Sequence, residues 1–131
     1  MIVVHALDGT AIEINEAAVT LVAGPYPHDI GPRTYVHGVA RGVLVTAEDA
    51  AALVARLGQN PPLAKLTRPD STPVWVKRSA ISAIRPPLAT EQQKAGMVRA
   101  VLVIGDLALH QAVREDVRTV AGILNPGVAT V

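Results

Sequence analysis

The stretch VHALDGTAIEINEAAVTLVAGP (residues 4–25) decides the expected fold, because its pattern returns as LTRPDSTPVWVKRSAISAIRPP (residues 66–87). Aligned so that Val4 matches Leu66 and Pro25 matches Pro87, the two stretches share few identities, but their apolar positions coincide. Apolar positions set the register of a strand, because alternate side chains face opposite sides of a sheet. A pattern that recurs in this way indicates a duplicated supersecondary unit.

Each stretch predicts a strand, a tight turn and two further strands. The turns are Asp8-Gly9-Thr10 and Asp70-Ser71-Thr72, where an Asp side chain can accept hydrogen bonds from local amides. Apolar and polar residues then alternate at 12–14 and 74–76, as in a half-buried strand. The first strands are expected over 2–7 and 63–67, and the third strands over 18–22 and 80–84.

A Pro-rich loop, a hairpin and a helix complete each predicted unit. The hairpin strands are expected at 35–38 and 43–46 in the first unit, and at 102–105 and 107–110 in the second. Apolar residues at helical spacing then predict helices over 47–57 and about 113–124. Thr46, with Asp49 three residues later, resembles a capping box that would begin the first helix.

These patterns predict a β-rich α+β fold. It consists of two pseudo-symmetric antiparallel β units, each closed by one C-terminal helix. The first ββββα-type unit covers residues 1–58, a linker covers 59–62, and the second ββββα-type unit covers 63–131. We expect the units to share one core, because about 60 residues with few aromatics would be marginal alone.

The composition favours association. Half of the residues are hydrophobic, Phe is absent, and Trp75, Tyr26 and Tyr35 are the only aromatics. Such an aliphatic core buries less area per residue than an aromatic one, which suggests further burial through self-association. The net charge is +1, but residues 1–62 carry −3 and residues 63–131 carry +4. This asymmetry can orient head-to-tail contacts, can mark an anion-facing surface, or can be an ordinary solvated pattern.

Several classes of protein are disfavoured by the sequence. The absence of Cys excludes disulfides and thiolate chemistry. No apolar run is long enough for a membrane helix, and the N-terminus lacks the pattern of a signal peptide. We therefore expect no membrane partner, and a location in the cytoplasm or in an assembly built there.

The phrase at 65–76, followed by 80–84, resembles the FlbD-type family of small flagellar-associated proteins, and 2–15 resembles it too. The resemblance implies a strand–turn–strand opening, a second hairpin and a helix that begins with acidic residues. Family members are single units, whereas this chain has two units with Pro-rich insertions. The family supplies no catalytic residues, so the resemblance implies a small accessory or structural role.

No catalytic, cofactor or metal site is predicted, and we expect the protein not to be an enzyme. The serines lie outside nucleophile motifs, and no phosphate-binding Gly-rich motif is present. A metal site from His28, Asp29 and His37 is conceivable, against the simpler interpretation of a loop and a strand histidine.

The partner-binding candidates are Trp75, Lys77, Arg78 and Arg85, with Lys65, Arg68 and Arg99 expected nearby. Trp75 aligns with Glu13, so its side chain is expected to point away from the buried face of the sheet. An outward Trp among cations could anchor a protein interface, pack within the chain, or stack on single-stranded nucleic acid.

Two functions follow as hypotheses. The first is a non-enzymatic structural protein that self-associates as a homo-oligomer, or docks in a larger protein complex such as an appendage or virion. The alternative is a small-barrel nucleic-acid-binding protein that uses the basic second unit. A steep salt dependence of oligonucleotide binding would identify the alternative.

Overall fold

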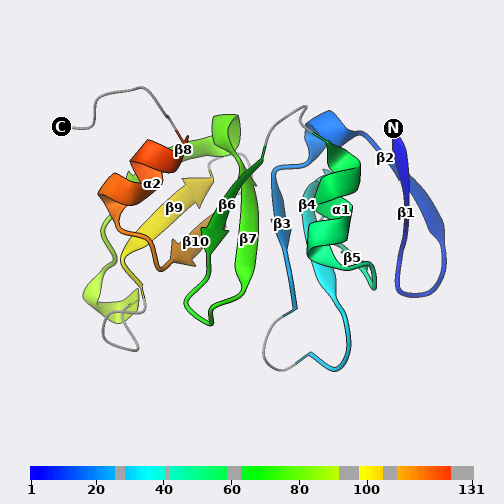
Figure 1. Ribbon diagram of the computed structural model, residues 1–131, viewed down its shortest axis with the longest axis horizontal. Helices are drawn as coiled ribbons and strands as arrows, with labels where there is room; N and C mark the ends of the chain where they lie inside the picture. Colours follow the sequence, from blue (N-terminus) through cyan, green and yellow to red (C-terminus); the bar gives the residue numbers. More distant parts are fainter. Residues whose placement is uncertain (26–28, 41, 59–62, 92–97, 105–108, 125–131) are drawn as a thin grey trace.

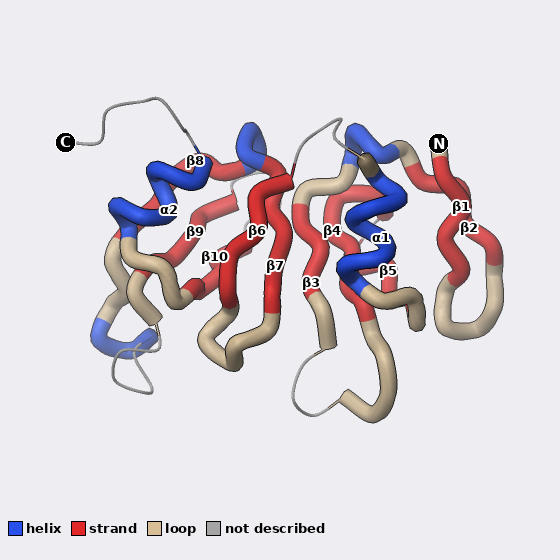
Figure 2. Tube along the Cα trace, viewed as in Figure 1, coloured by secondary structure: helices blue, strands red, loops and turns tan. Residues whose placement is uncertain are grey.

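The computed structural model describes residues 1–25, 29–40, 42–58, 63–91, 98–104 and 109–124 (Figures 1 and 2). This part of the chain is β-rich, with antiparallel strands in three sheets and two α-helices, which confirms the β-rich character of the prediction. The predicted linker at 59–62 lies outside the described residues.

The chain follows the same order of elements before and after the linker, except that the second half has an additional 3-10 turn. The first half consists of β1 (Ile2–His5), β2 (Ala11–Ile14), the 3-10 turn η1 (Glu16–Ala18), β3 (Leu21–Ala23), β4 (Thr34–Ala40), β5 (Gly42–Thr46) and α1 (Ala50–Leu57). The second half consists of β6 (Leu63–Thr67), β7 (Pro73–Lys77), η2 (Arg78–Ala80), β8 (Ile81–Arg85), η3 (Ala89–Glu91), β9 (Ala100–Ile104), β10 (Leu109–Val113) and α2 (Val117–Leu124).

The second hairpin pairs with the first half of the chain. The largest sheet has the strand order β5-β4-β3-β7-β6, so β7 lies beside β3 (Figure 1). In this antiparallel pair Leu21 is opposite Val76, and Val22 is opposite Trp75. The hairpin of β1 and β2 forms a separate two-stranded sheet, and β10-β9-β8 forms the third. The central sheet therefore continues from one half of the chain into the other.

Two apolar clusters lie on either side of the β3–β7 pair. One cluster contains Val22 and Trp75 together with α1 and the β1–β2 hairpin. The other contains Leu21 and Val76 together with α2, β6 and β9. Because consecutive residues of β3 and β7 belong to different clusters, both faces of these strands are covered, and both lack the exposed polar face of an ordinary two-layer strand.

The helices begin later than the sequence predicts. The N-cap of α1 is Asp49, whose carboxylate accepts a hydrogen bond from the Ala52 amide at 3.1 Å, so the prediction of Thr46 as the cap is wrong. Thr46 is instead the buried last residue of β5, paired with Thr34. Val113, predicted as helical, ends β10. Both are β-branched residues that suit a packed strand.

The third strands also differ from prediction, because each is preceded by a 3-10 turn. Ala18 ends η1, and the Asn15 side chain caps this turn by accepting a hydrogen bond from the Ala17 amide at 3.0 Å. Ala80 likewise ends η2. The strands β3 and β8 therefore begin at Leu21 and Ile81, beyond the predicted starts at 18 and 80.

Candidate docking edge

Trp75 is buried between the two halves of the chain, where the sequence predicts an outward position. Its exposed fraction is 7%, and it packs in the cluster that contains α1. The Lys65 ammonium lies 5.8 Å from the centre of its ring, within cation–π range. Trp75 does face away from the cluster of its own half, but the face it occupies is covered by α1 and the β1–β2 hairpin of the first half. Its observed contacts are therefore intramolecular.

Lys77 also makes a contact between the halves. Its ammonium donates to the Ala17 carbonyl at 2.8 Å, and its backbone amide donates to the Thr20 carbonyl at 2.8 Å. The second bond extends the β3–β7 pair by one residue. Lys77 thus holds the η1 turn against the end of β7.

Arg78 and Arg85 lie at the two ends of the segment that leads through η2 and β8. Arg78 is exposed at the start of η2, and Arg85 is the last residue of β8, where its guanidinium donates to the Pro86 carbonyl at 3.2 Å. Of the four predicted residues, these two belong to the β8 region, and Trp75 and Lys77 belong to the junction of the halves. The predicted group is therefore divided between two places.

Arg68, expected on the same basic surface, is buried with an exposed fraction of 3%. Its guanidinium donates to the Gly24 and Pro25 carbonyls at 3.0 and 2.9 Å and lies 3.8 Å from the Asp70 carboxylate. A buried charge needs such partners, since desolvation would otherwise be costly. Arg68 therefore links the β6–β7 turn to the end of β3.

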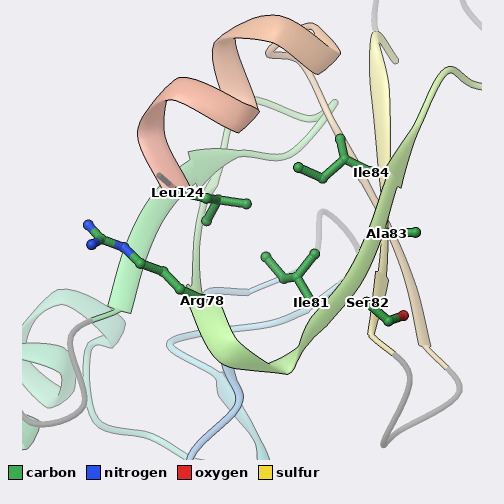
Figure 3. A pocket seen from close by; sticks show the side chains of 6 residues that line it. All are labelled: Arg78, Ile81, Ser82, Ala83, Ile84 and Leu124. Carbon is green, nitrogen blue, oxygen red and sulfur yellow. The ribbon is translucent and has the colours of Figure 1, made fainter. Parts of the chain in front are cut away.

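A hollow of about 240 Å³ lies beside β8, as Figure 3 shows. Its apolar wall consists of Ile81, Ile84 and Leu124, and Arg78 stands at its side. Both isoleucines are partly buried and pack against the cluster that contains α2. The hollow thus gives access to the margin of that cluster.

The outer edge of β8 adjoins this hollow and has no strand beside it in the described part of the chain. β8 pairs with β9 on its inner side and is the last strand of its sheet. Ser82 and Ala83 are exposed along it. An edge strand presents unpaired amides and carbonyls that can accept another strand. The sequence did not reveal this edge, because pairing partners are not visible in a single strand's pattern.

The surroundings of Asp70 and His37 lower the pKa of each group. Burial opposes ionisation of the Asp70 carboxyl, but hydrogen bonds from Thr72 and the charge of Arg68 outweigh it and lower the pKa of Asp70. Burial lowers the pKa of His37. The Asp29 carboxylate accepts a hydrogen bond from the Tyr35 hydroxyl at 2.8 Å. His28, the third residue of the conceivable metal site, lies outside the described residues, among which no cluster of metal-binding side chains occurs.

Neither α-helix in the described ranges has the length and apolarity that crossing a bilayer requires. Comparisons with models of protein families, with curated proteins and with solved structures found no match. The resemblance to the FlbD-type family therefore stays a prediction.

Proposed function

We propose that this protein is a non-enzymatic structural subunit that self-associates through the open edges of its sheets. The proposal has two supports. The first is a repeated order of elements in which one half of the chain already binds the other by strand pairing. The second is the presence of further edges of the same kind that no strand covers within the described residues.

The two hairpin turns support duplication in atomic detail. The Thr10 amide donates to the Asp8 carboxylate at 2.9 Å, and the Thr72 amide donates to the Asp70 carboxylate at 3.0 Å. Gly9 and Ser71 both have positive φ, at 90° and 74°. Ser71 is the only described non-Gly residue in this conformation, which is uncommon for a residue with a side chain. The two turns therefore share one geometry, which supports the duplication.

The strand registers support duplication as well. Ile2 lies opposite Ile14 in the first hairpin, and Ala64 lies opposite Val76 in the second. The sequence alignment that matches Val4 with Leu66 also matches these two pairs. The Thr20 hydroxyl donates to the His37 carbonyl at 3.0 Å, and the Ser82 hydroxyl donates to the Val103 carbonyl at 3.1 Å. Thr20 and Ser82 are equivalent in the same alignment.

One observation carries the proposal: the halves are joined by the β3–β7 pair, while β8, which matches β3 in the sequence alignment, has no strand on its outer side within the described residues. Two halves that associate edge to edge within a chain have a surface suited to the same contact between chains. Exposed edges of this kind are usually blunted or covered when a protein must stay monomeric.

Sedimentation velocity over a wide range of protein concentration tests the proposal. We expect the weight-average mass to rise above that of the 13.7 kDa chain as concentration increases. A protein that stays monomeric throughout, to high concentration and at low salt, would refute it.

Nucleic-acid binding by the second half is not favoured by the geometry. The expected stacking residue, Trp75, is 7% exposed, and Arg68 is used within the chain. Stacking on a base requires an accessible aromatic face.

A further inference from the structure

We infer that β2 of one copy of this chain pairs antiparallel with the outer edge of β8 of the next copy. Ile14 would lie opposite Ala83, Glu13 opposite Ile84, and Ile12 opposite Arg85. The inference rests on the proposed function and specifies which edges meet and in what register.

The template for this contact is the β3–β7 pair inside the chain. There, Val76 is opposite Leu21, Trp75 is opposite Val22, and Val74 is opposite Ala23. The alignment of the two halves relates β2 to β7 and β3 to β8. Because β7 pairs with β3, the corresponding partner of β8 is β2. Within the described part of one chain β2 pairs with β1 alone, so this second junction is not formed there.

The two edges lie where a second copy can reach them. In Figure 1 the β1–β2 hairpin is at one end of the elongated molecule, and the sheet of β8, β9 and β10 is at the opposite end. A single chain therefore cannot bring its own β2 to its own β8. Two copies arranged head to tail can do so, with the first half of one chain against the second half of the next.

The side chains fit this arrangement. Ile14 is already buried in the cluster that contains α1, as Val76 is in the other cluster, so pairing with the small Ala83 requires no repacking. Glu13 is exposed on the opposite face of β2. By analogy with Trp75, its side chain would extend over the neighbouring copy's hollow, which both Ile84 and Arg78 line.

Charge favours the same orientation. The first half carries −3 and the second half +4, so a head-to-tail contact brings opposite charges together, whereas head-to-head and tail-to-tail contacts bring like charges together. Charge complementarity of this kind selects among possible orientations.

The contact joins two different surfaces and is therefore heterologous. Such contacts continue until a ring closes, or extend as a filament if the rotation does not close. Every copy in a closed ring would have both edges covered, with the intrachain β3–β7 junction alternating with the interchain β2–β8 junction.

Cysteine cross-linking tests the register, and the absence of native Cys removes background. In the double variant Ile12→Cys/Arg85→Cys the two thiols of adjacent copies face each other across the antiparallel pair. Residues directly opposite in such a pair have Cβ atoms about 4.5–5.5 Å apart, close to disulfide geometry. Mild oxidation of the double variant is expected to give a ladder of covalent multimers on non-reducing gels.

Three matched variants control the cross-link. Ile12→Cys and Arg85→Cys alone should give no ladder. In the inferred register residue 12 lies opposite residue 85 of the next copy, so a single variant never places two thiols opposite each other. Val3→Cys/Arg85→Cys should also give none, because Val3 lies opposite Glu13 on β1, one strand further from the edge. The additional strand adds a spacing of about 4.8 Å, which places residues 3 and 85 too far apart for a disulfide.

The outcomes separate this inference from the proposed function. A ladder that forms in Ile12→Cys/Arg85→Cys and in none of the three control variants supports the inferred register. Assembly in sedimentation without a ladder, in a double variant with a native circular dichroism spectrum, overturns the register and leaves self-association standing. A wild-type monomer at all concentrations overturns both.

Hydrogen exchange of the wild-type protein keeps the inference testable if the double variant does not fold. The amides within 12–14 and 83–85 that point to the outer edges of β2 and β8 should gain protection as protein concentration rises and the assembly forms. Successive amides of a strand point to opposite edges, so the amides that face β1 and β9 should not change. Assembly without added protection at the outer-edge amides would overturn the β2–β8 pairing.

Discussion

Asp70 stabilises the turn between β6 and β7 in its ionised form. Its pKa is lowered because hydrogen bonds from Thr72 and the charge of Arg68 exceed the opposing effect of burial. As pH falls, the unfolded chain therefore takes up a proton at this position before the folded chain does. The stabilisation is complete above the ordinary Asp pKa of 3.8 and is lost as pH falls through the lower folded-state value.

We predict that Asp70→Asn lowers stability at neutral pH and reduces the loss of stability on acidification. Urea unfolding of both proteins at neutral pH and at about pH 3 measures the difference. Asp8 and Asp116 also have lowered pKa values and would remain in the variant, so the pH dependence should be reduced and not abolished. An unchanged difference between the two pH values would contradict the assigned cause.

Gly38 is required where β4 passes the η1 turn. Its φ is +103°, and a Cβ there would lie 2.3 Å from the Ala18 carbonyl oxygen. Both the backbone conformation and the lack of space exclude a side chain. We predict that Gly38→Ala destabilises the protein by about 1–3 kcal/mol or more, the cost of a strained backbone position with an added clash.

Gly122 supplies a matched control for the same substitution. It lies in α2, and a Cβ there would meet nothing within 4 Å. Gly122→Ala should stabilise by about 0.5–1 kcal/mol, because Ala is the better helix former. Denaturant unfolding of the two variants should therefore give changes of opposite sign. Equal effects would show that the close approach at Gly38 is unimportant.

At the scale of single elements, α1 depends on Asp49 for its first turn. The carboxylate of Asp49 accepts a hydrogen bond from the Ala52 amide, and that of Asp116 accepts one from the Thr119 amide at the same position of α2. We predict that Asp49→Ala lowers the free energy of unfolding by about 1 kcal/mol, a usual value for an N-cap. Asp49→Asn should change it little, since Asn caps about as well. A loss of similar size in both variants would contradict the capping role.

Single elements were predictable where a local pattern determines them. The strand predicted at 63–67 has those bounds, and the Asp turns form as expected because their bonds are local. The helix starts were not predictable, since Thr46 and Val113 are held in strands by partners elsewhere in the chain. Thr46 and Val113 lie close to the helices in the sequence, but the sequence does not show that each pairs with a residue of another strand.

The position of Trp75 shows the same limit for the candidate site. Alternation along β7 correctly separates Trp75 from Val74 and Val76, but it cannot show that the cluster containing α1 covers the second face. Side chains alternate between the two faces in the same way whether one face of a strand is exposed or both faces are buried, so the alternation does not distinguish the two cases. The docking edge at β8 was likewise invisible, because its character depends on which strands are absent beside it in the described part of the chain.

At the scale of the whole molecule, repetition in the sequence predicts equivalent elements but not how they are shared between sheets. The β6–β7 hairpin joins β3, while the matching β1–β2 hairpin forms a sheet of its own. This difference in surroundings fits the proposal that the inner junction is made within the chain and the outer one between two copies.

Charge reversal at the outer junction tests this view of the molecule. Glu13 is exposed on β2, and Arg78 is exposed at the start of η2, which leads from β7 into β8, so neither is required for the core. We predict that Glu13→Lys weakens self-association several-fold in sedimentation, because it places two cations together across the junction and because Lys on an edge strand disfavours pairing. Folding stability at low concentration should change little.

The compensating variant separates pairing across the junction from a general effect of charge. Arg78→Glu alone should also weaken association, whereas Glu13→Lys/Arg78→Glu should recover most of it by restoring opposite charges. A contact made by net charge alone would respond differently, since the double variant leaves the total charge unchanged but reduces the asymmetry between the halves. Failure of the double variant to associate better than either single variant would therefore exclude Glu13 and Arg78 as neighbours across the junction.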